Sequence, residues 1–284
     1  MCQACPTPAF STKQRVLSKQ DFAPEERRAF EFMLSEYRDT LAPIEDDIEG
    51  WLSGADPDDL TNLQTIREQI RTLTDGRVGE FEIVFGEGAQ RGAAAGRELA
   101  ARRSQFDIAF DIVPERTLDV LDDWATEAAG STLETITEDA SRWLRGAHEE
   151  GLSIDDIASQ LNDDLFDGRL EDYVAERAAR TGTISSSNAG AHSAYEDADG
   201  VVAEEWLTSL DGRERDDHAE ADGQVVAVDT TFEVGGVYLD HPGDPGAPVG
   251  QIANCRCAVV PVLADDLTDE QLDAVEAGER IWIR

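Results

Sequence analysis

The chain has 284 residues, enough to bury the core of one large domain or of two smaller ones. It carries 61 Asp and Glu residues against 24 Lys and Arg residues, which gives a formal net charge of −37 at pH 7 and a sequence pI near 4.2. Hydrophobic residues still make up 40% of the chain, and no apolar run is long enough to span a bilayer. The composition therefore argues against a disordered protein and against a membrane protein.

The basic residues of the chain are almost all arginines, because Lys13 and Lys19 are its lysines. Few lysines beside many carboxylates indicate a protein that works in molar salt, where the Debye length is only about 3 Å and neighbouring carboxylates repel weakly. We therefore expect a halophilic source, a haloarchaeon or its virus. Such a negative surface also disfavours direct binding to DNA. Binding to DNA gains free energy when basic side chains release counterions from the phosphates, and this chain has few basic side chains.

Residues 1–20 are predicted to form a polar N-terminal tail, which carries a Cys2-x-x-Cys5 pair. The tail lacks the charged and apolar segments of a secretory signal peptide, and two cysteine pairs at opposite ends of the chain do not form a secreted disulfide framework. We expect a soluble protein made in the cytoplasm. A Cys-x-x-Cys pair can bind zinc, but zinc normally takes four ligands, so two more would come from elsewhere in the chain.

Residues 21–150 carry helical patterns, and we predict a helical region there. Pro24 suits the first turn of one helix, and Asp56-Pro57 suits the start of the next. Apolar residues at steps of three and four predict the buried stripe of that second helix: Leu60, Leu63, Ile66, Ile70 and Leu73.

The same helical region continues with a third helix over residues 79–103, whose small residues permit close helix packing. Residues 106–113 alternate like a short strand or an extended link. Residues 118–146 predict a further helix, which Gly130-Ser131 interrupts.

The pattern changes within residues 151–264, which predict a small α+β domain followed by a C-terminal tail at residues 265–284. Ser153 and Asp156 have the spacing of a capping box that begins a short helix, and a long helix follows over residues 170–197. The period then becomes two, and Gly-, Asp- and Pro-rich turns separate the predicted strands Val201–Thr208, Gln224–Val228, Phe232–Val234 and Ala258–Val262. The expected domain has two helices packed on a short antiparallel sheet.

Polar residues of this second region form three groups in the sequence. Those residues are Arg177, Arg180, Thr181 and Asn188 on the long helix, then Asp211, Arg213, Arg215 and His218, and finally Asn254, Cys255, Arg256 and Cys257. Steps that sum to near-whole turns place the first group, with His192, close to one helical stripe.

The order of these elements resembles the phage Mu F-like minor head proteins of tailed viruses. Members of that family have a helix with Arg-Thr and Asn-x-Gly, then a Trp, then Asp-x-Arg-x-Arg-x-x-His, an Asp-Gly turn and a final Asn-Cys-Arg-Cys strand. In this chain the matching positions are Arg180-Thr181, Asn188-Ala189-Gly190, Trp206, Asp211 to His218, Asp222-Gly223 and Asn254 to Cys257. The chain departs from the pattern at Gly182, where the family has an acidic residue, and at Ala253, where it has a proline.

The resemblance implies a structural protein of the virion and not an enzyme. Such a protein would be present in low copy, bound to the portal protein inside the capsid, and would act in head assembly and in genome ejection. Its further partners would be the major capsid protein and other copies of itself. The resemblance also implies that the helical region over residues 21–150 is extended, and its apolar stripes suit packing against a portal ring.

Three interpretations of the polar residues stay open. In the first, they are structural ties, in which Asp211 pairs with Arg213 or Arg215 and Asn254 with Arg256 to join the loops of the sheet to the long helix. In the second, His218, Cys255 and Cys257, with or without Cys2 and Cys5, hold a structural zinc ion.

On a strand, Cys255 and Cys257 would lie on the same face, with about 7 Å between the two residues. Both thiolates could then coordinate one ion only if the chain turns at Arg256. We therefore expect both thiols to pack in the core, with no cofactor required. In the third interpretation, Asp211, Arg215 and His218 work with Cys255 or Cys257 as the catalytic group of a hydrolase.

A zinc-dependent hydrolase or an ADP-ribosyltransferase-like enzyme is a further alternative, because domains of the resembled family also occur attached to toxins. The Glu-x-Glu of this chain, Glu80-Phe81-Glu82, lies far outside the resembled region and has no Ser-Thr-Ser strand beside it. The position of this motif argues against the transferase.

Overall fold

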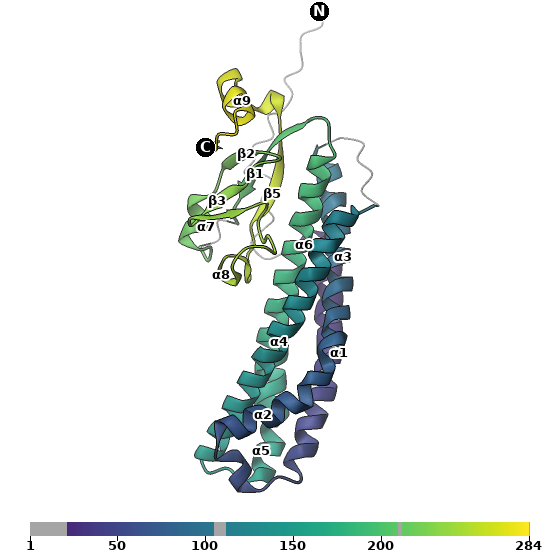
Figure 1. Ribbon diagram of the computed structural model, residues 1–284, viewed down its shortest axis with the longest axis vertical. Helices are drawn as coiled ribbons and strands as arrows, with labels where there is room; N and C mark the ends of the chain where they lie inside the picture. Colours follow the sequence, from purple (N-terminus) through teal and green to yellow (C-terminus); the bar gives the residue numbers. More distant parts are fainter. Residues whose placement is uncertain (1–21, 105–111, 210–211, 284) are drawn as a thin grey trace, which may run out of the picture.

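A computed structural model of the chain describes residues 22–104, 112–209 and 212–283 (Figure 1). The α-helices are α1 (Pro24–Leu52), α2 (Leu63–Thr74), α3 (Val78–Ser104), α4 (Glu115–Glu149), α5 (Ile154–Gln160), α6 (Glu176–Glu196), α7 (Asp216–Glu220), α8 (Val249–Ile252) and α9 (Asp269–Glu276). Short 3-10 turns lie at η2 (Pro57–Leu60), η3 (Asp75–Arg77) and η5 (Ala264–Asp266), and a π-helical stretch, η4 (Leu161–Ala175), leads into α6. The strands are β1 (Val201–Leu207), β2 (Gln224–Ala227), β3 (Phe232–Val234), β4 (Val237–Leu239), β5 (Ala258–Leu263) and β6 (Ile281–Trp282).

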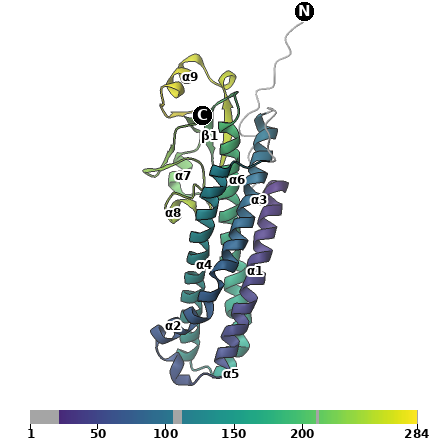
Figure 2. The same ribbon diagram turned by 45° about the vertical axis from the view of Figure 1, so that its right-hand side comes forward.

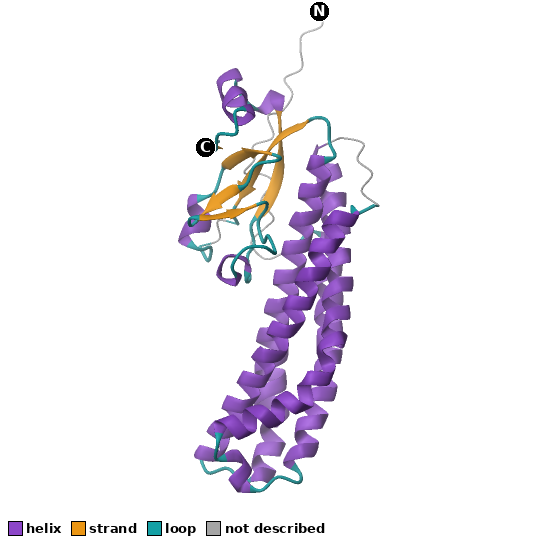
Figure 3. Ribbon diagram, viewed as in Figure 1, coloured by secondary structure: helices purple, strands orange, loops and turns teal. Residues whose placement is uncertain are grey.

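The long helices α1, α3, α4 and α6 run along one axis and form an elongated bundle, which α2 and α5 close at one end (Figures 1 and 2). The small antiparallel sheet lies against the other end (Figure 3). This arrangement confirms the predicted α+β fold with a long helical region. Among the described helices, none combines the length and the apolar character that a bilayer-spanning segment needs.

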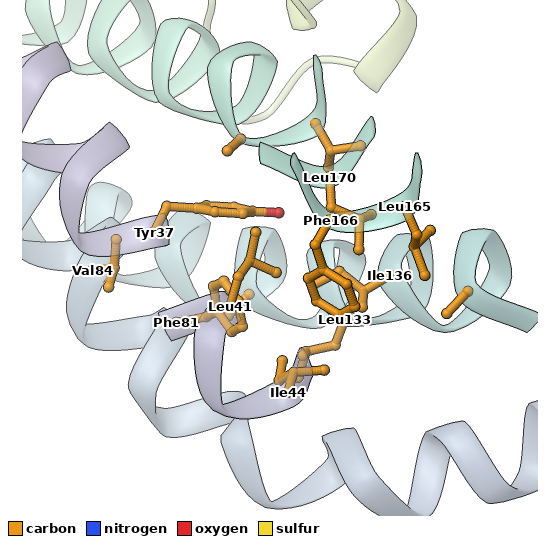
Figure 4. Close-up of a cluster of buried hydrophobic side chains, with 14 of the residues drawn as sticks. Tyr37, Leu41, Ile44, Phe81, Val84, Leu133, Ile136, Leu165, Phe166 and Leu170 are labelled. Atoms are coloured by element: carbon orange, nitrogen blue, oxygen red, sulfur yellow. The ribbon is translucent and has the colours of Figure 1, made fainter. Parts of the chain in front are cut away.

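The core of the bundle is built from the apolar stripes of its helices. Tyr37, Leu41 and Ile44 of α1 meet Phe81 of α3, Ile136 of α4 and Phe166 of η4, and all of them are fully buried (Figure 4). Burial of one such side chain contributes roughly 1.5–3 kcal/mol. The stripe predicted for the second helix is confirmed at Leu60, Ile66 and Ile70, which lie in the same core.

Helix α4 runs without a break from Glu115 to Glu149, so the predicted interruption at Gly130-Ser131 is wrong. Glycine inside a helix costs only about 1 kcal/mol relative to alanine. The buried neighbours Ala129, Thr132 and Leu133 hold this turn against the bundle, and their packing outweighs that cost. Most of the predicted extended link over residues 106–113 lies outside the described residues.

Helices α3 and α6 approach each other so closely that side chains would not fit between them. Gly92 and Gly96 lie four residues apart on the side of α3 that faces α6, whereas Gly88, one turn earlier, faces Met33 of α1. A Cβ atom on Gly96 would overlap the carbonyl oxygen of Ser187, and one on Gly190 would overlap the carbonyl oxygen of Ala93. The small residues therefore set the distance between the two helix axes.

The sheet has the strand order β5-β1-β2-β6, with every pair antiparallel, and a separate β3–β4 hairpin turns at Gly235-Gly236. One sheet face carries Trp206, Val226 and Val259 and packs against α6. The opposite face carries Ala203, Val225 and Val262 and is covered by Val275 of α9. Both sides of the sheet are thus buried, as the short apolar strands require.

The C-terminal residues take part in the sheet domain. Thr268 caps α9 by accepting a hydrogen bond from the Gln271 amide, and Ile281 of β6 pairs with Val225 of β2. We expected a domain boundary at residue 151. This residue lies between α4 and α5, and both of these helices belong to the bundle.

Replacement of Gly96 by alanine is expected to destabilise the fold, because the added methyl group meets main-chain atoms of α6 that cannot move aside. Overpacking of this kind costs about 1–3 kcal/mol, which corresponds to a fall in Tm of roughly 2–12 °C for a chain of this size. Gly86→Ala on the same helix is the control, since a Cβ atom there has nothing within 4 Å. Thermal unfolding should show Gly86→Ala at or slightly above the wild-type Tm, and equal Tm values for the two variants would contradict the close packing.

Candidate functional site

Helix α6 is joined to the sheet through the side chain of Asn188, which is 5% exposed. Its Nδ2 donates to the carbonyl oxygen of Cys257 at 3.0 Å, and its Oδ1 accepts from the amide of Val259 at 3.0 Å. Strand β5 is an edge of the sheet, so these main-chain groups face away from β1. The amide of Asn188 therefore pairs with the edge of β5 as a neighbouring strand would.

A second contact of α6 holds the turn before β5. The Oγ1 of Thr181 accepts from the amide of Asn254 at 2.9 Å. Asn254 has a φ of +56°, a left-handed conformation that asparagine adopts more readily than most residues. This turn ends the segment before Cys255, so Cys255 and Cys257 lie in a loop ahead of β5 and not on the strand.

The loop brings both thiols to the side chain of His218, which α7 supplies. His218 Nδ1 lies 3.4 Å from the Sγ of Cys257 and 3.7 Å from the Sγ of Cys255. All three side chains are buried, and their Nδ1 and Sγ atoms lie within 4.8 Å of one another. The two thiols are buried, as expected. They are not only packing groups, however, because both also face one imidazole nitrogen.

Polar neighbours fix the orientation of the His218 ring. Its Nε2 lies 2.9 Å from the Oε1 of Gln251, whose own Nε2 donates to Asp217 Oδ2 at 2.6 Å. Gln251 must then accept from His218, which places the imidazole proton on Nε2 and leaves the Nδ1 lone pair facing the sulfur atoms. Thr208 adds a hydrogen bond from its Oγ1 to the carbonyl oxygen of His218.

The contact between the two thiols shifts their pKa values in opposite directions. A hydrogen bond from Cys257, followed by the contacts of His218, holds the pKa of Cys255 well below its usual range. The same hydrogen bond to Cys255, together with burial, raises the pKa of Cys257. Burial alone would lower the pKa of His218, but its contacts with Cys255 and Gln251 raise it overall. Cys255 is thus the sulfur that more readily becomes a thiolate.

A pocket of about 380 Å³ opens beside this cluster. Polar residues from the two loops line it: Ser209, Arg213, Glu214, Arg215, Asn254 and Arg256, together with His218, Cys255 and Cys257. Arg215 also donates from Nη2 to the carbonyl oxygen of Ala253 at 2.5 Å, which joins the loop before α7 to the loop before β5.

The structure places the predicted polar residues in two surroundings. Thr181, Asn188 and the residues of the two loops meet at the junction of α6 and the sheet. Arg180 instead pairs with Glu176 and lies over the rings of Phe22 and Phe30 beside α1, and Arg177 lies over Tyr173. Asp211, Cys2 and Cys5 lie outside the described residues.

A buried ion pair that the sequence did not predict lies at the same junction. His192 Nδ1 lies 2.8 Å from Oε2 of Glu204, a residue with no exposed side-chain surface on β1. Burial would lower the pKa of His192, but Glu204 reverses this effect and raises it to about 9. Burial raises the pKa of Glu204 to about 7 against the opposing influence of His192.

Further titratable groups surround this pair. Glu196 of α6 and Asp240 after β4 add negative charge, which favours the protonated imidazole of His192. Neighbouring His241 is buried, and both its burial and the charge of His192 lower its pKa to about 4. His192 is therefore the ring of the two that is charged near neutral pH.

Comparison with known proteins relates this junction to one known protein family. The model of the family described as Phage Mu protein F like protein matches residues 141–260, a range that includes α6, the strands β1 to β4 and the first half of β5. The chain is 28% identical over 164 residues to the uncharacterized protein YqbB of Bacillus subtilis, covering 55% of this chain and 52% of that protein.

Two more relatives match shorter parts. An uncharacterized protein of Haemophilus influenzae is 36% identical over 108 residues, which cover 38% of this chain and 21% of that protein. A protein of Enterococcus faecalis named NAD(+)--arginine ADP-ribosyltransferase EFV is 29% identical over 117 residues, which cover 40% of this chain and 23% of that protein. The chain thus spans about half the length of the first relative and about a fifth of the others. No solved structure matches the chain.

The His192–Glu204 pair predicts a loss of stability at alkaline pH. The pKa of His192 is higher in the folded protein than in an unfolded chain, so its stabilising contribution is complete below about pH 6.5 and is lost as the pH rises through about 9. Chemical unfolding of the wild type should show the free energy of unfolding fall by about 2–3 kcal/mol from pH 7 to pH 9.5. His192→Gln should remove most of this dependence, and an unchanged pH profile in that variant would rule out the pair as its source.

Proposed function

Because residues 141–260 of the chain match the model of the Phage Mu protein F like family, we propose that the protein is a minor head protein of a tailed virus and acts in head morphogenesis. The observation that carries this proposal is the position of the family match. It covers the α6–sheet junction, where residues that carry the family resemblance contact one another. These contacts join Thr181 to Asn254, Asn188 to Cys257, and His218 to Cys257. The family supports a location in the virion head.

We propose further that the protein binds in low copy to the portal protein inside the capsid and takes part in genome ejection. An elongated bundle with the sheet at one end suits a protein that extends from a ring-shaped vertex (Figure 2). Its net charge of −37 would keep it from adhering to the packaged DNA. Contacts with the major capsid protein and with further copies of the chain belong to the same proposal.

The protein is also proposed to work at high salt. Its bundle contains carboxylates that repel one another, and Glu45 is an example. Burial raises the pKa of Glu45 first, and the charges of Asp167 and Glu171 raise it further. At about 1 M salt the Debye length is only about 3 Å, which screens this repulsion.

An enzymatic function is the second candidate, and two observations favour it: the cluster of His218 with two thiols, and the similarity to the Enterococcus protein that is named an ADP-ribosyltransferase. The position of Glu80 and Glu82 weighs against a transferase. Both residues lie on helix α3 around the buried Phe81 and not on a strand beside a pocket. We therefore propose that the protein is structural and not an enzyme.

Deletion of the gene from the virus or prophage that carries it tests the proposal. We expect few complete heads, and we expect the wild-type protein to be present in purified virions and to cross-link to the portal protein. Complementation by Gly86→Ala should restore head formation, whereas Gly96→Ala, which disturbs the bundle, should not. A normal yield of heads without the gene, or absence of the protein from virions, would refute the proposal.

The salt proposal predicts that Tm rises steeply between about 0.1 M and 1 M KCl, because added ions screen the excess carboxylates. Glu45→Gln removes one of the repelling charges, so it should raise Tm at low salt and have little effect at high salt. Calorimetry of both proteins across the salt range measures this difference. A wild-type Tm that is the same at millimolar and molar salt would exclude adaptation to high salt.

A further inference from the structure

The cluster of His218, Cys255 and Cys257 has the dimensions of a metal centre. A tetrahedral zinc ion with bonds of about 2.0–2.1 Å to nitrogen and about 2.3 Å to sulfur holds these ligand atoms roughly 3.6 Å apart. The Nδ1 of His218 lies 3.4 Å from one sulfur and 3.7 Å from the other. Both nitrogen–sulfur distances therefore match the spacing that one ion would impose, and the two sulfur atoms lie within 4.8 Å of each other.

The chemistry of the three groups is equally suitable. Zinc binds a neutral imidazole nitrogen and thiolate sulfur. The contact between His218 Nε2 and Gln251 leaves Nδ1 as the free lone pair, and Asp217 holds Gln251 in turn. Metal-ligating histidines are commonly oriented in this way by a partner on the other ring nitrogen. The backbone amide of Cys257 also donates to the Sγ of Cys255 at 3.4 Å, which favours a thiolate there.

The local backbone is shaped to present both sulfurs to one point. The left-handed turn at Asn254 and the loop through Arg256 turn Cys255 and Cys257 toward His218, although they are two residues apart in sequence. Both cysteines are free thiols in the structure and do not form a disulfide.

We propose that His218 Nδ1 and the Sγ atoms of Cys255 and Cys257 bind one zinc ion. Zinc normally takes a fourth ligand, which would come from the adjoining pocket that Ser209 and Glu214 help to line. The ion fastens α7 to the loop before β5 by coordination bonds, which molar salt does not screen as it screens ion pairs. Its role is thus to hold the sheet end of the domain together.

The test is the metal content of the full-length protein after purification without chelators. We expect one zinc per chain, and loss of that zinc in His218→Asn, Cys255→Ser and Cys257→Ser. His148→Gln on α4, and a variant with Cys2→Ser and Cys5→Ser, should keep it. Zinc that is absent from folded wild-type protein, or that depends on Cys2 and Cys5 and not on Cys255 and Cys257, would overturn the proposal, as would a Cys255–Cys257 disulfide found by mass spectrometry.

A ligand variant could lose zinc simply because it fails to fold. Gln251→Ala avoids this ambiguity, because it keeps all three proposed ligands and removes only the partner of His218 Nε2. We expect this variant to bind zinc about 10–100-fold more weakly, as loss of a partner behind a ligating histidine usually does. Titration of metal-free protein with Co²⁺ should give thiolate-to-cobalt absorption in the wild type, with the midpoint moved to higher concentration in Gln251→Ala. Cobalt binding without thiolate absorption, or with the same midpoint in both folded proteins, would contradict the assignment.

Discussion

The side chain of Asn188 is the contact on which the arrangement of bundle and sheet depends. Strand β5 is a sheet edge, and its free carbonyl and amide groups at Cys257 and Val259 would be costly to bury without partners. Asn188 supplies one donor and one acceptor at 3.0 Å each, so the edge of the sheet ends on a helix and not on solvent. These two hydrogen bonds fix the rotation of α6 about its own axis and its position along that axis relative to β5.

The same helix is fixed on its other side by the glycines of α3, since Gly96 and Gly190 leave main-chain atoms of the two helices in contact. Polar contacts follow from this close approach. Arg97 of α3, which is 3% exposed, donates to Ser193 of α6 at 2.9 Å, and Arg103 donates to the carbonyl oxygen of Val259 at 3.3 Å. Because α6 contacts both α3 and β5, the packing of the bundle determines where the sheet lies. It thereby also determines the positions of the loops that carry His218 and Cys255.

Apolar periodicity predicted the helices and strands well, because burial of one face is a local property of the sequence. It failed at Gly130, where packing of α4 outweighs the weak helix preference of one glycine. The polar residues Thr181 and Asn188 were predicted to join helix and sheet, but the sequence does not reveal that their partners are main-chain groups. The ion pair of His192 was missed, although Glu204 alternates onto the same strand face as Trp206, and a carboxylate on an apolar face requires a partner.

Amide hydrogen exchange of β5 tests the role of Asn188 most directly. In Asn188→Ala the amide of Val259 loses its acceptor, so we predict faster exchange along β5 and in the loop of Cys255 and Cys257, with little change in α1 and α2. Gln90→Ala, which removes an exposed amide side chain from α3, should leave the whole pattern as in the wild type. Unchanged protection of β5 in Asn188→Ala would show that the sheet does not depend on this contact and would contradict the account.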